Sequence, residues 1–321
     1  MINPVYIAVG LAMILWSSCF VGIRAALQDF SPEHLAVFRF ILASLAMLLY
    51  APWAKVRMPH IKDIPALFLH GFLGYTAFSL AINHGESLIS AGSTSFIIAT
   101  VPVFATILAV ITLKEKVSPR TYVGLFISMV GIGIISFGEG GGISLNIGAL
   151  FVLLAAISDS IYIVLQKPFF KKYTAYEYTT YTMVTGTILL CFYLPGLPDQ
   201  IAAASWHSIA ATVHLGVFGT AIPYALWTYG VSKADVSKIV ISQYTIPVMA
   251  LVVGYVWLGE IPPILAILGG GIALAGAVFS SISFRALKRF RKPQPPTPRA
   301  VYQSVCVKPT IQPTSNYAHR P

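Results

Sequence analysis

Ionisable side chains are rare in this chain, and one carboxylate falls in the middle of an apolar segment. Asp159 lies about twelve residues into the apolar run 147–166, roughly 18 Å along a helix that rises 1.5 Å per residue. Tyr162 and Gln166 follow at spacings that place all three side chains on one helical stripe. Because an ionisable group at such a depth is costly, Asp159 is predicted to be a counter-ion for a cationic group or a proton carrier. The structural alternative is a carboxyl group that is hydrogen-bonded to a neighbouring helix.

Arg39 is the complementary case, a cation roughly a turn and a half inside the apolar run 34–52. A buried cation at the centre of a bilayer costs about 2.5 kcal/mol or more, so it needs a partner or a wet cavity. One interpretation pairs Arg39 with Glu33 or lets the side chain reach outward to the headgroups. The other assigns Arg39 to gathering an anionic group of a solute.

Aromatic and polar residues in the same apolar runs are the candidates for a solute-binding wall, since ligand pockets are mostly aromatic with a few polar groups. For Tyr75 the alternative is a tyrosine packed in the core, and for the serines of these runs it is packing between helices. The predicted substrate-binding residues are Trp16, Phe20, Tyr75, Phe78, Asp159, Tyr162, Tyr224, Trp227, Gln243 and Tyr244.

Three further residues are candidates for gating or coupling, beside Arg39 and Asp159. His84 lies in a short polar connection, where it is either an outer gate or proton relay or simply a wet interfacial residue. Pro102 and Pro247 each interrupt an apolar run, and a proline inside a helix removes one backbone hydrogen bond and kinks it. Matching kinks predict paired gates, with two inherited structural bends as the alternative.

The composition requires a lipid environment. The chain has 321 residues, of which 56% are hydrophobic and only 10% charged, against about 25% charged in soluble domains. A bilayer core needs roughly 20 apolar residues per helical crossing. We therefore predict an all-α polytopic membrane protein with ten transmembrane helices, near 5–24, 34–52, 65–84, 92–112, 121–138, 147–166, 174–194, 208–229, 236–258 and 263–284.

The net charge of +10 is explained by topology. With the N-terminus in the cytoplasm, all of the 21 Lys and Arg residues except Arg24 and Arg39 fall in the inner connections or the C-terminal tail. This asymmetry is the positive-inside pattern of membrane proteins, and it argues against a nucleic-acid partner. It predicts a multi-pass protein of the cell inner membrane with both termini cytoplasmic.

The chain also contains an internal duplication. Pro102 and Pro247 are 145 residues apart, and the same offset relates eight or so Gly, Pro, Glu and Ser positions, including Gly74 and Gly219. Five crossings per copy would make the halves inverted repeats, which in secondary transporters enclose a site near the midplane. The expected organisation is a first repeat over 1–138, a glycine-rich linker over 139–146, a second repeat over 147–284 and a basic, proline-rich disordered tail over 285–321.

The sequence resembles the EamA-type transporters of the drug/metabolite transporter superfamily. The resemblance rests on Leu15-Trp16-Ser17, on Phe38-Arg39-Phe40 and on two prolines followed thirteen residues later by glutamate, Pro102/Glu115 and Pro247/Glu260. It implies ten helices, a central cavity and alternating access, with amino acids, other metabolites or drugs as solutes. From their positions before helix starts, Glu115 and Glu260 are expected to cap those helices.

These observations favour a secondary transporter that exports small metabolites or amino-acid-like solutes by alternating access, with proton coupling through Asp159. No P-loop is present, the cysteines are scattered, and no cofactor or metal site is expected. The expected partners are a small-molecule solute, membrane lipid and a second copy of the chain in a homodimer. The alternatives are a non-transporting membrane sensor or assembly protein and an intramembrane enzyme, although no catalytic motif is found and no enzyme is expected.

Overall fold

The computed structural model describes residues 4–113, 119–140, 146–233, 236–259 and 263–281. Within these ranges every regular element is a helix, as predicted. The α-helices are α1 (Pro4–Ala26), α2 (Pro32–Tyr50), α3 (Ile64–Gly71), α4 (Phe78–Leu88), α5 (Ala91–Ile98), α6 (Val101–Leu113), α7 (Pro119–Gly140), α8 (Ile147–Leu165), α9 (Ala175–Leu190), α10 (Leu197–Ala203), α11 (Trp206–Gly216), α12 (Ile222–Lys233), α13 (Val236–Val240), α14 (Ile246–Leu258) and α15 (Ile264–Ser281).

Shorter helical turns join several of these helices into longer rods. Two are π-helical, η2 (Phe72–Ala77) between α3 and α4 and η5 (Val217–Ala221) between α11 and α12. Four are 3₁₀-helical: η1 (Ile61–Asp63), η3 (Lys167–Lys171), η4 (Cys191–Tyr193) and η6 (Ile241–Thr245).

Six helical rods in the described part of the chain are long and apolar enough to cross a membrane, and a seventh joins them if a pair bent by 85° is one span. The six are Pro4–Ala26, Pro32–Tyr50, Ile61–Leu88, Ala91–Thr112, Ile147–Lys171 and Trp206–Lys233, and the bent pair is Ala175–Tyr193 with Leu197–Ala203. The helices α7, α14 and α15 occupy the remaining predicted segments. The polytopic helical class is confirmed, and the count of ten crossings stays a prediction.

The helix starts follow from local sequence. Ser31, Ser90, Thr174 and Ser205 each accept a hydrogen bond from the backbone N–H three residues later, as N-cap residues do. Thr174 adds a capping box, because the Glu177 carboxylate accepts a hydrogen bond from the Thr174 N–H at 2.8 Å. Such caps fix where a rod begins and so fix which residues reach the interior.

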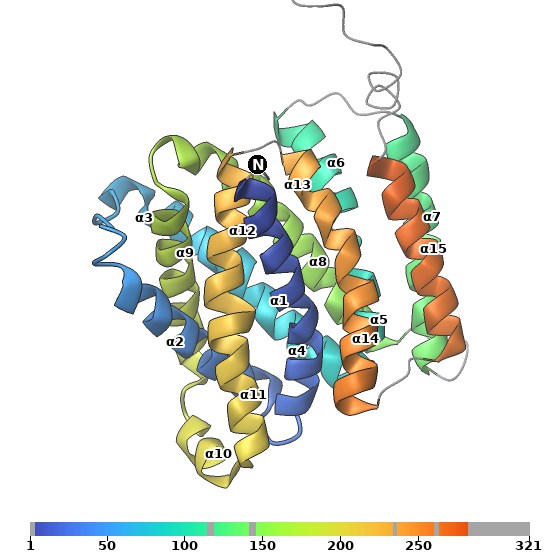
Figure 1. Cartoon of the computed structure of the whole chain (residues 1–321), viewed down its shortest axis with the longest axis horizontal. Coiled ribbons are helices and arrows are strands. Elements are labelled where there is room, and N and C mark those ends of the chain that lie inside the picture. Colours follow the sequence, from blue (N-terminus) through green and yellow to red (C-terminus); the bar gives the residue numbers. More distant parts are fainter. Residues whose placement is uncertain (1–3, 114–118, 141–145, 234–235, 260–262, 282–321) are drawn as a thin grey trace, which may run out of the picture. The chain divides into compact units, whose positions relative to one another are not determined.

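The helices α7 and α15 pack against each other as an antiparallel pair (Figure 1). A Cβ atom on Gly276 would lie 2.6 Å from the Gly124 carbonyl oxygen, and one on Gly269 would lie 2.7 Å from the Gly131 carbonyl oxygen. Close approach therefore depends on glycine in both helices. Residue numbers rise along one helix as they fall along the other, so the two helices point in opposite directions.

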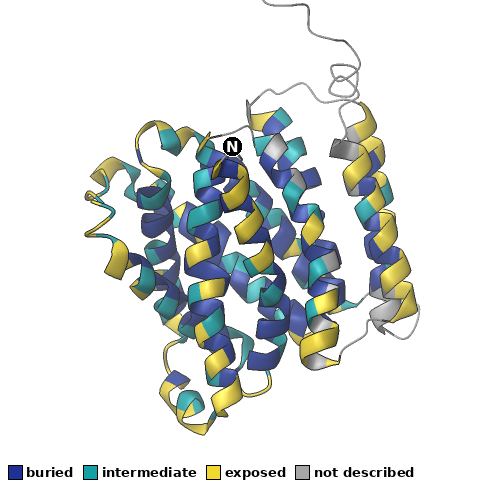
Figure 2. Cartoon of the chain, viewed as in Figure 1, coloured by how far each residue is buried: buried dark blue, intermediate teal, exposed yellow. Residues whose placement is uncertain are grey.

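Buried residues concentrate where α1, α2, α4, α8, α9 and α12 meet, and exposed apolar residues cover outward faces of these and other helices (Figure 2). Many of the exposed residues are large and apolar: leucine, isoleucine, valine and aromatic residues. The interior, in contrast, contains many Ser, Thr and Tyr hydroxyl groups. Many polar side chains therefore face the interior of the helical bundle.

Candidate functional site

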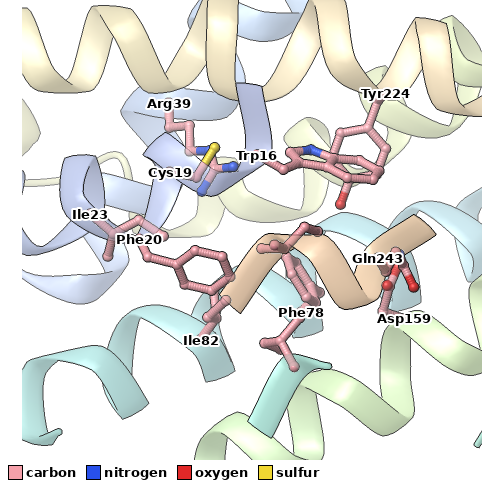
Figure 3. Close-up of a pocket in the computed structure, with 12 residues that line it drawn as sticks. Trp16, Cys19, Phe20, Ile23, Arg39, Phe78, Ile82, Asp159, Tyr224 and Gln243 are labelled. Carbon is pink, nitrogen blue, oxygen red and sulfur yellow. The ribbon is translucent and has the colours of Figure 1, made fainter. Parts of the chain in front are cut away.

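A cavity lies between α1, α2, α4, α5, α8, α12 and the segment η6–α14 (Figure 3). Its volume, measured as the space open to the centre of a water molecule, is about 50 Å³. That is room for roughly three to five waters, since about 10–15 Å³ on this measure holds one. The lining residues are Trp16, Cys19, Phe20, Ile23, Arg39, Phe78, Ile82, Ile98, Asp159, Tyr224, Gln243 and Ile246.

An aromatic cluster forms one wall of the cavity. The Trp16 ring meets Tyr224 edge-on with ring centroids 5.2 Å apart, and Trp227 packs against Trp16 at 5.4 Å. Tyr75 packs against Tyr224 with ring centroids 4.9 Å apart. Edge-on and tilted pairs at these distances are favourable for aromatic rings, so each ring holds its neighbour in place.

Arg39 supplies a cation to the cavity wall although its residue is only 3% exposed. Its Nε donates to Thr220 Oγ1 at 2.6 Å and one terminal nitrogen donates to the Gly219 carbonyl at 3.4 Å. The guanidinium carbon lies 5.6 Å from the centre of the Phe40 ring. Among the described residues, none of the carboxylates lies within ion-pair distance of Arg39. The charge is therefore hydrogen-bonded but not neutralised.

Asp159 supplies the opposite charge at the other side of the same cavity, beside Gln243 (Figure 3). Among the residues that the structure describes, Asp159 makes no side-chain hydrogen bond and no ion pair. Since buried polar groups normally find partners, the carboxylate has capacity left for a ligand.

The two π-helical turns bring backbone carbonyls to the site. In η2 the Leu73 carbonyl accepts from Ser158 Oγ at 2.8 Å and the Gly74 carbonyl accepts from Tyr224 Oη at 3.5 Å. In η5 the Gly219 carbonyl accepts from Cys19 and from Arg39. A π-turn widens the helix and leaves carbonyls without the usual i+4 partner, which is why side chains from distant helices reach these.

Seven of the predicted residues line the cavity: Trp16, Phe20, Arg39, Phe78, Asp159, Tyr224 and Gln243. Tyr75, Tyr162 and Trp227 lie behind this lining as fully buried packing residues. Tyr75 and Tyr162 share a hydrogen bond of 2.9 Å between their hydroxyl groups. Tyr244 is half-buried in η6 and does not line the cavity.

Five lining residues were not predicted: Cys19, Ile23, Ile82, Ile98 and Ile246. Three of them lie one helical turn after a predicted residue, Cys19 after Trp16, Ile23 after Phe20 and Ile82 after Phe78. The helical repeat was thus the available signal. Ile98 and Ile246 end or begin helices at the breaks near the two prolines, where periodicity gives no guide.

His84, a gating candidate, contacts a carboxylate and a backbone carbonyl. His84 Nε2 lies 3.0 Å from a Glu33 carboxylate oxygen, and His84 Nδ1 lies 2.8 Å from the Leu80 carbonyl oxygen. Glu33 therefore contacts His84, whereas Arg39 contacts Thr220.

The two prolines lie in the first turns of α6 and α14 rather than inside continuous helices. Pro102 follows a break after α5, and Pro247 follows η6. Proline is tolerated in a first turn because the N–H it lacks has no partner there. The expected kink is thus an interruption, at equivalent positions of the two copies. Glu115, Glu260, most of the glycine-rich linker and the tail over 285–321 lie outside the described residues.

A multi-helix apolar chain with a charged, aromatic-lined internal cavity has the architecture of a membrane transporter. The model of the EamA-like transporter family matches residues 3–137 and again residues 146–282. The chain belongs to this family and is a multi-pass membrane transporter.

Similar proteins carry the same class of name. The chain is 39% identical to "Uncharacterized transporter YdfC" of Bacillus subtilis (strain 168), with 86% of this chain and 90% of that protein covered. It is 35% identical to "Probable terminal-alkyne amino-acid exporter" of Streptantibioticus cattleyicolor, with 90% and 96% covered. A crystal structure matches with a TM-score of 0.63 and 16% identity, covering 90% of this chain and 99% of that chain, which supports the fold alone.

Proposed function

We propose that the protein is a secondary transporter that exports amphipathic zwitterions of the amino-acid type by alternating access. The observation that carries the proposal is the placement of Arg39 and Asp159 at opposite sides of one cavity, with Trp16 and Tyr224 between them (Figure 3). Neither charge is neutralised by another described side chain.

The two charges are complementary to a solute that has a carboxylate and an ammonium group. Arg39 uses Nε and one terminal nitrogen on the protein, and a guanidinium has five N–H donors in a planar fork, so donors remain for a carboxylate. Asp159 accepts hydrogen bonds only and suits an ammonium group. Apolar and aromatic lining residues then take the solute's side chain. The name of the Streptantibioticus relative, an amino-acid exporter, points in the same direction.

The size of the cavity supports a mechanism in which the helices move. Ligand pockets for small molecules occupy about 300–1,000 Å³, whereas this cavity offers about 50 Å³ to water-sized spheres. A cavity for a few waters does not hold an amino acid. The described conformation is therefore assigned to a closed state between two open ones.

An inverted repeat supplies such a motion. We assign ten crossings to two five-helix units, 1–138 and 147–284, joined by the linker 139–146 and followed by a cytoplasmic tail. Support comes from the two matches of the family model, from the antiparallel α7–α15 pair, and from element starts such as Val101 of α6 and Ile246 of α14, which differ by the sequence offset. The positive-inside pattern puts both termini on the cytoplasmic side of the inner membrane.

Asp159 is the proposed coupling group. A single carboxylate cannot hold a proton and pair with a substrate ammonium group at the same time, because the protonated form is neutral. A proton that enters down its gradient and binds Asp159 would displace the ammonium group of the solute. Proton influx would therefore be coupled to solute efflux. That exchange accounts for export.

The test is flux in proteoliposomes made with the purified full chain. A labelled apolar amino acid is loaded inside, and efflux is measured with and without an imposed pH gradient. Unlabelled competitors share one side chain and differ only in charge: the amino acid, its decarboxylated amine and its deaminated acid. We expect the amino acid to compete at least about 10-fold better than either analogue.

Two results would overturn the proposal in different ways. Equal competition by the amine or the acid would remove the zwitterion and leave a transporter of another solute class. Failure of the whole panel to move or to bind would exclude amino-acid-like solutes.

A further inference from the structure

Two buried side chains beyond the cavity have polar atoms without a hydrogen-bond partner among the described residues. Gln166, which caps the C-terminal end of α8, and Thr228 of α12 are both 0% exposed. In the described part of the chain, neither amide atom of Gln166 has a hydrogen-bond partner, and neither does the Thr228 hydroxyl. Buried polar groups without partners are rare, so each needs an explanation.

Both side chains continue the faces of the helices that form the cavity wall. Asp159 and Gln166 are seven residues apart, which is within about 20° of two full helical turns, so they project from one face of α8 about 10 Å apart along its axis. Tyr224 and Thr228 are four residues apart and lie on one face of α12. From the cavity-lining residues Asp159 and Tyr224, both rows run toward the end of α8.

A hydrogen bond joins η3, the turn after α8, to α12 at that end. Lys167 Nζ donates to the Val231 carbonyl at 2.7 Å, and α12 packs against η3, the turn that begins with Lys167. Gln166 directly precedes Lys167, and Val231 lies one turn after Thr228. Along their helices, the two residues therefore lie between the cavity-lining positions and this contact.

A purely structural role does not explain the pair. Leucine and valine of similar size would fill the same space without losing hydration, because an unpartnered buried amide or hydroxyl destabilises the folded state. The polar groups become favourable if another conformation of the protein brings water or solute to them.

We propose that Gln166 and Thr228 line the passage that connects the cavity to the membrane face at which α8 ends. The passage is closed in the described conformation by the Lys167–Val231 contact and opens when α8 and α12 separate. The proposal rests on the transport cycle proposed above, and it adds where the solute passes and which polar groups it meets there.

The experiment compares apolar isosteres in the same proteoliposomes. Gln166→Leu and Thr228→Val remove the polar atoms and keep the volume. Thr212→Val is the matched control, because Thr212 is also 0% exposed but its hydroxyl donates to the Ser208 carbonyl within α11. Thr228→Ser restores the hydroxyl. Maximal exchange rate, the half-saturating solute concentration and the thermal midpoint are measured for each.

We expect Gln166→Leu and Thr228→Val to lower the maximal exchange rate by about 10-fold or more, with the half-saturating concentration changed less than about twofold. Their thermal midpoints should equal or exceed that of the unaltered protein. Thr212→Val should exchange at the unaltered rate with an equal or lower midpoint, and Thr228→Ser should regain most of the lost rate.

Unchanged rates in both Gln166→Leu and Thr228→Val would overturn the passage. A fall in rate that accompanies a fall in midpoint in these variants, with no recovery in Thr228→Ser, would also overturn it, since that is the signature of a packing role. Failure of the transport proposal is recognised separately, because the unaltered protein itself would then exchange none of the solutes.

Discussion

The two π-helical turns, η2 and η5, occupy equivalent places in the two halves of the chain, but the side chains that contact them differ in charge. Gly74 and Gly219 are 145 residues apart, one in each turn, and the carbonyl of each accepts a hydrogen bond from a side chain of the other half. At Gly219 the donors are the Arg39 guanidinium and the Cys19 thiol. At Gly74 the donor is the neutral Tyr224 hydroxyl, with the Asp159 carboxylate nearby.

The comparison shows which features the two halves share and which features differ. The wide turns and their glycines are shared, because a backbone that opens its hydrogen-bond ladder needs close neighbours to satisfy it. The side chains around them diverged into a cationic surrounding and an anionic one. A cavity with two unlike ends, which two identical halves cannot produce, is the result.

Removing the cationic side should have the largest effect. Arg39→Met is expected to lower exchange of the zwitterion by about 100-fold, because two charge-assisted hydrogen bonds at about 1.5 kcal/mol each are lost. The decarboxylated amine should be handled equally well by the variant and the unaltered protein. Equal losses for both solutes would show that Arg39 serves the fold around η5 and not the solute.

Removing the anionic group of the cavity should lower the exchange rate less. Asp159→Asn is expected to lower zwitterion exchange by about 10-fold, since the amide oxygen still accepts a hydrogen bond from an ammonium group. The acceleration of flux by an imposed pH gradient should disappear, because an amide does not take up a proton. A variant that keeps the gradient dependence would place the coupling group elsewhere.

The glycines at the two turns should differ in tolerance to a methyl group. A Cβ on Gly74 would lie 2.6 Å from the Tyr162 ring, whereas one on Gly219 would lie 2.7 Å from the Cys19 sulfur. Gly74→Ala is expected to destabilise by about 2 kcal/mol net, since overpacking exceeds the gain of about 1 kcal/mol in helix propensity. Gly219→Ala should cost less.

Thermal or denaturant unfolding in detergent measures both changes. Adding Cys19→Ala should relieve Gly219→Ala, since it removes the sulfur that the new methyl group meets. No such relief exists for Gly74, because the Tyr162 hydroxyl is held by Tyr75 at 2.9 Å. Equal destabilisation by the two single variants would mean that the turns are equally tight.

Two contacts between connecting segments also differ in charge, and they should have the smallest effect. Lys172, after α8, donates to Asp63, before α3, at 2.9 Å, and this lysine holds the Asp63 pKa below its usual value. Asp29, after α1, accepts from Ser205 Oγ, before α11, at 2.6 Å, and this hydroxyl lowers the Asp29 pKa. One contact is an ion pair, and the other is a hydrogen bond to a neutral group.

Added salt should weaken the ion pair and not the hydrogen bond, whereas acid should weaken both contacts. Because both carboxyl pKa values are lower in the folded protein, both contributions are present above the unfolded value of about 4 and are lost as pH falls below it. Raising NaCl should reduce the effect of Lys172→Met on the thermal midpoint, which we expect to be about 1 °C, and leave that of Ser205→Ala unchanged. Equal salt sensitivity would contradict the distinction.

Much of the fold could be predicted from the sequence, and less of the site. Long apolar runs specify membrane helices directly, because lipid offers no partner for an open backbone. Asp159 and Arg39 were found because each is an anomaly in such a run. Cys19 and Ile82 carried no such signal, because an apolar or weakly polar residue in an apolar helix looks the same whether it faces lipid, another helix or a cavity.

For aromatic residues too, the sequence does not distinguish a side chain that lines the cavity from one that packs behind it. Trp16 and Trp227 are both tryptophans in apolar helices, but Trp16 lines the cavity and Trp227 is only 1% exposed behind it. The partner of Arg39 is equally a matter of packing. Thr220, which is 181 residues away, reaches Nε, whereas the neighbour Glu33 contacts His84.

By itself the amino-acid sequence determined the solvent of this protein, its helical class, the doubling of its pattern and the two charges that lipid would not tolerate alone. Those properties depend on composition and spacing, which are local. The tertiary structure alone decided which rings face the cavity, which carbonyls Arg39 and Tyr224 hold, and that Gln166 and Thr228 are enclosed without partners. Such choices depend on contacts between helices far apart in the chain, and no local pattern encodes them.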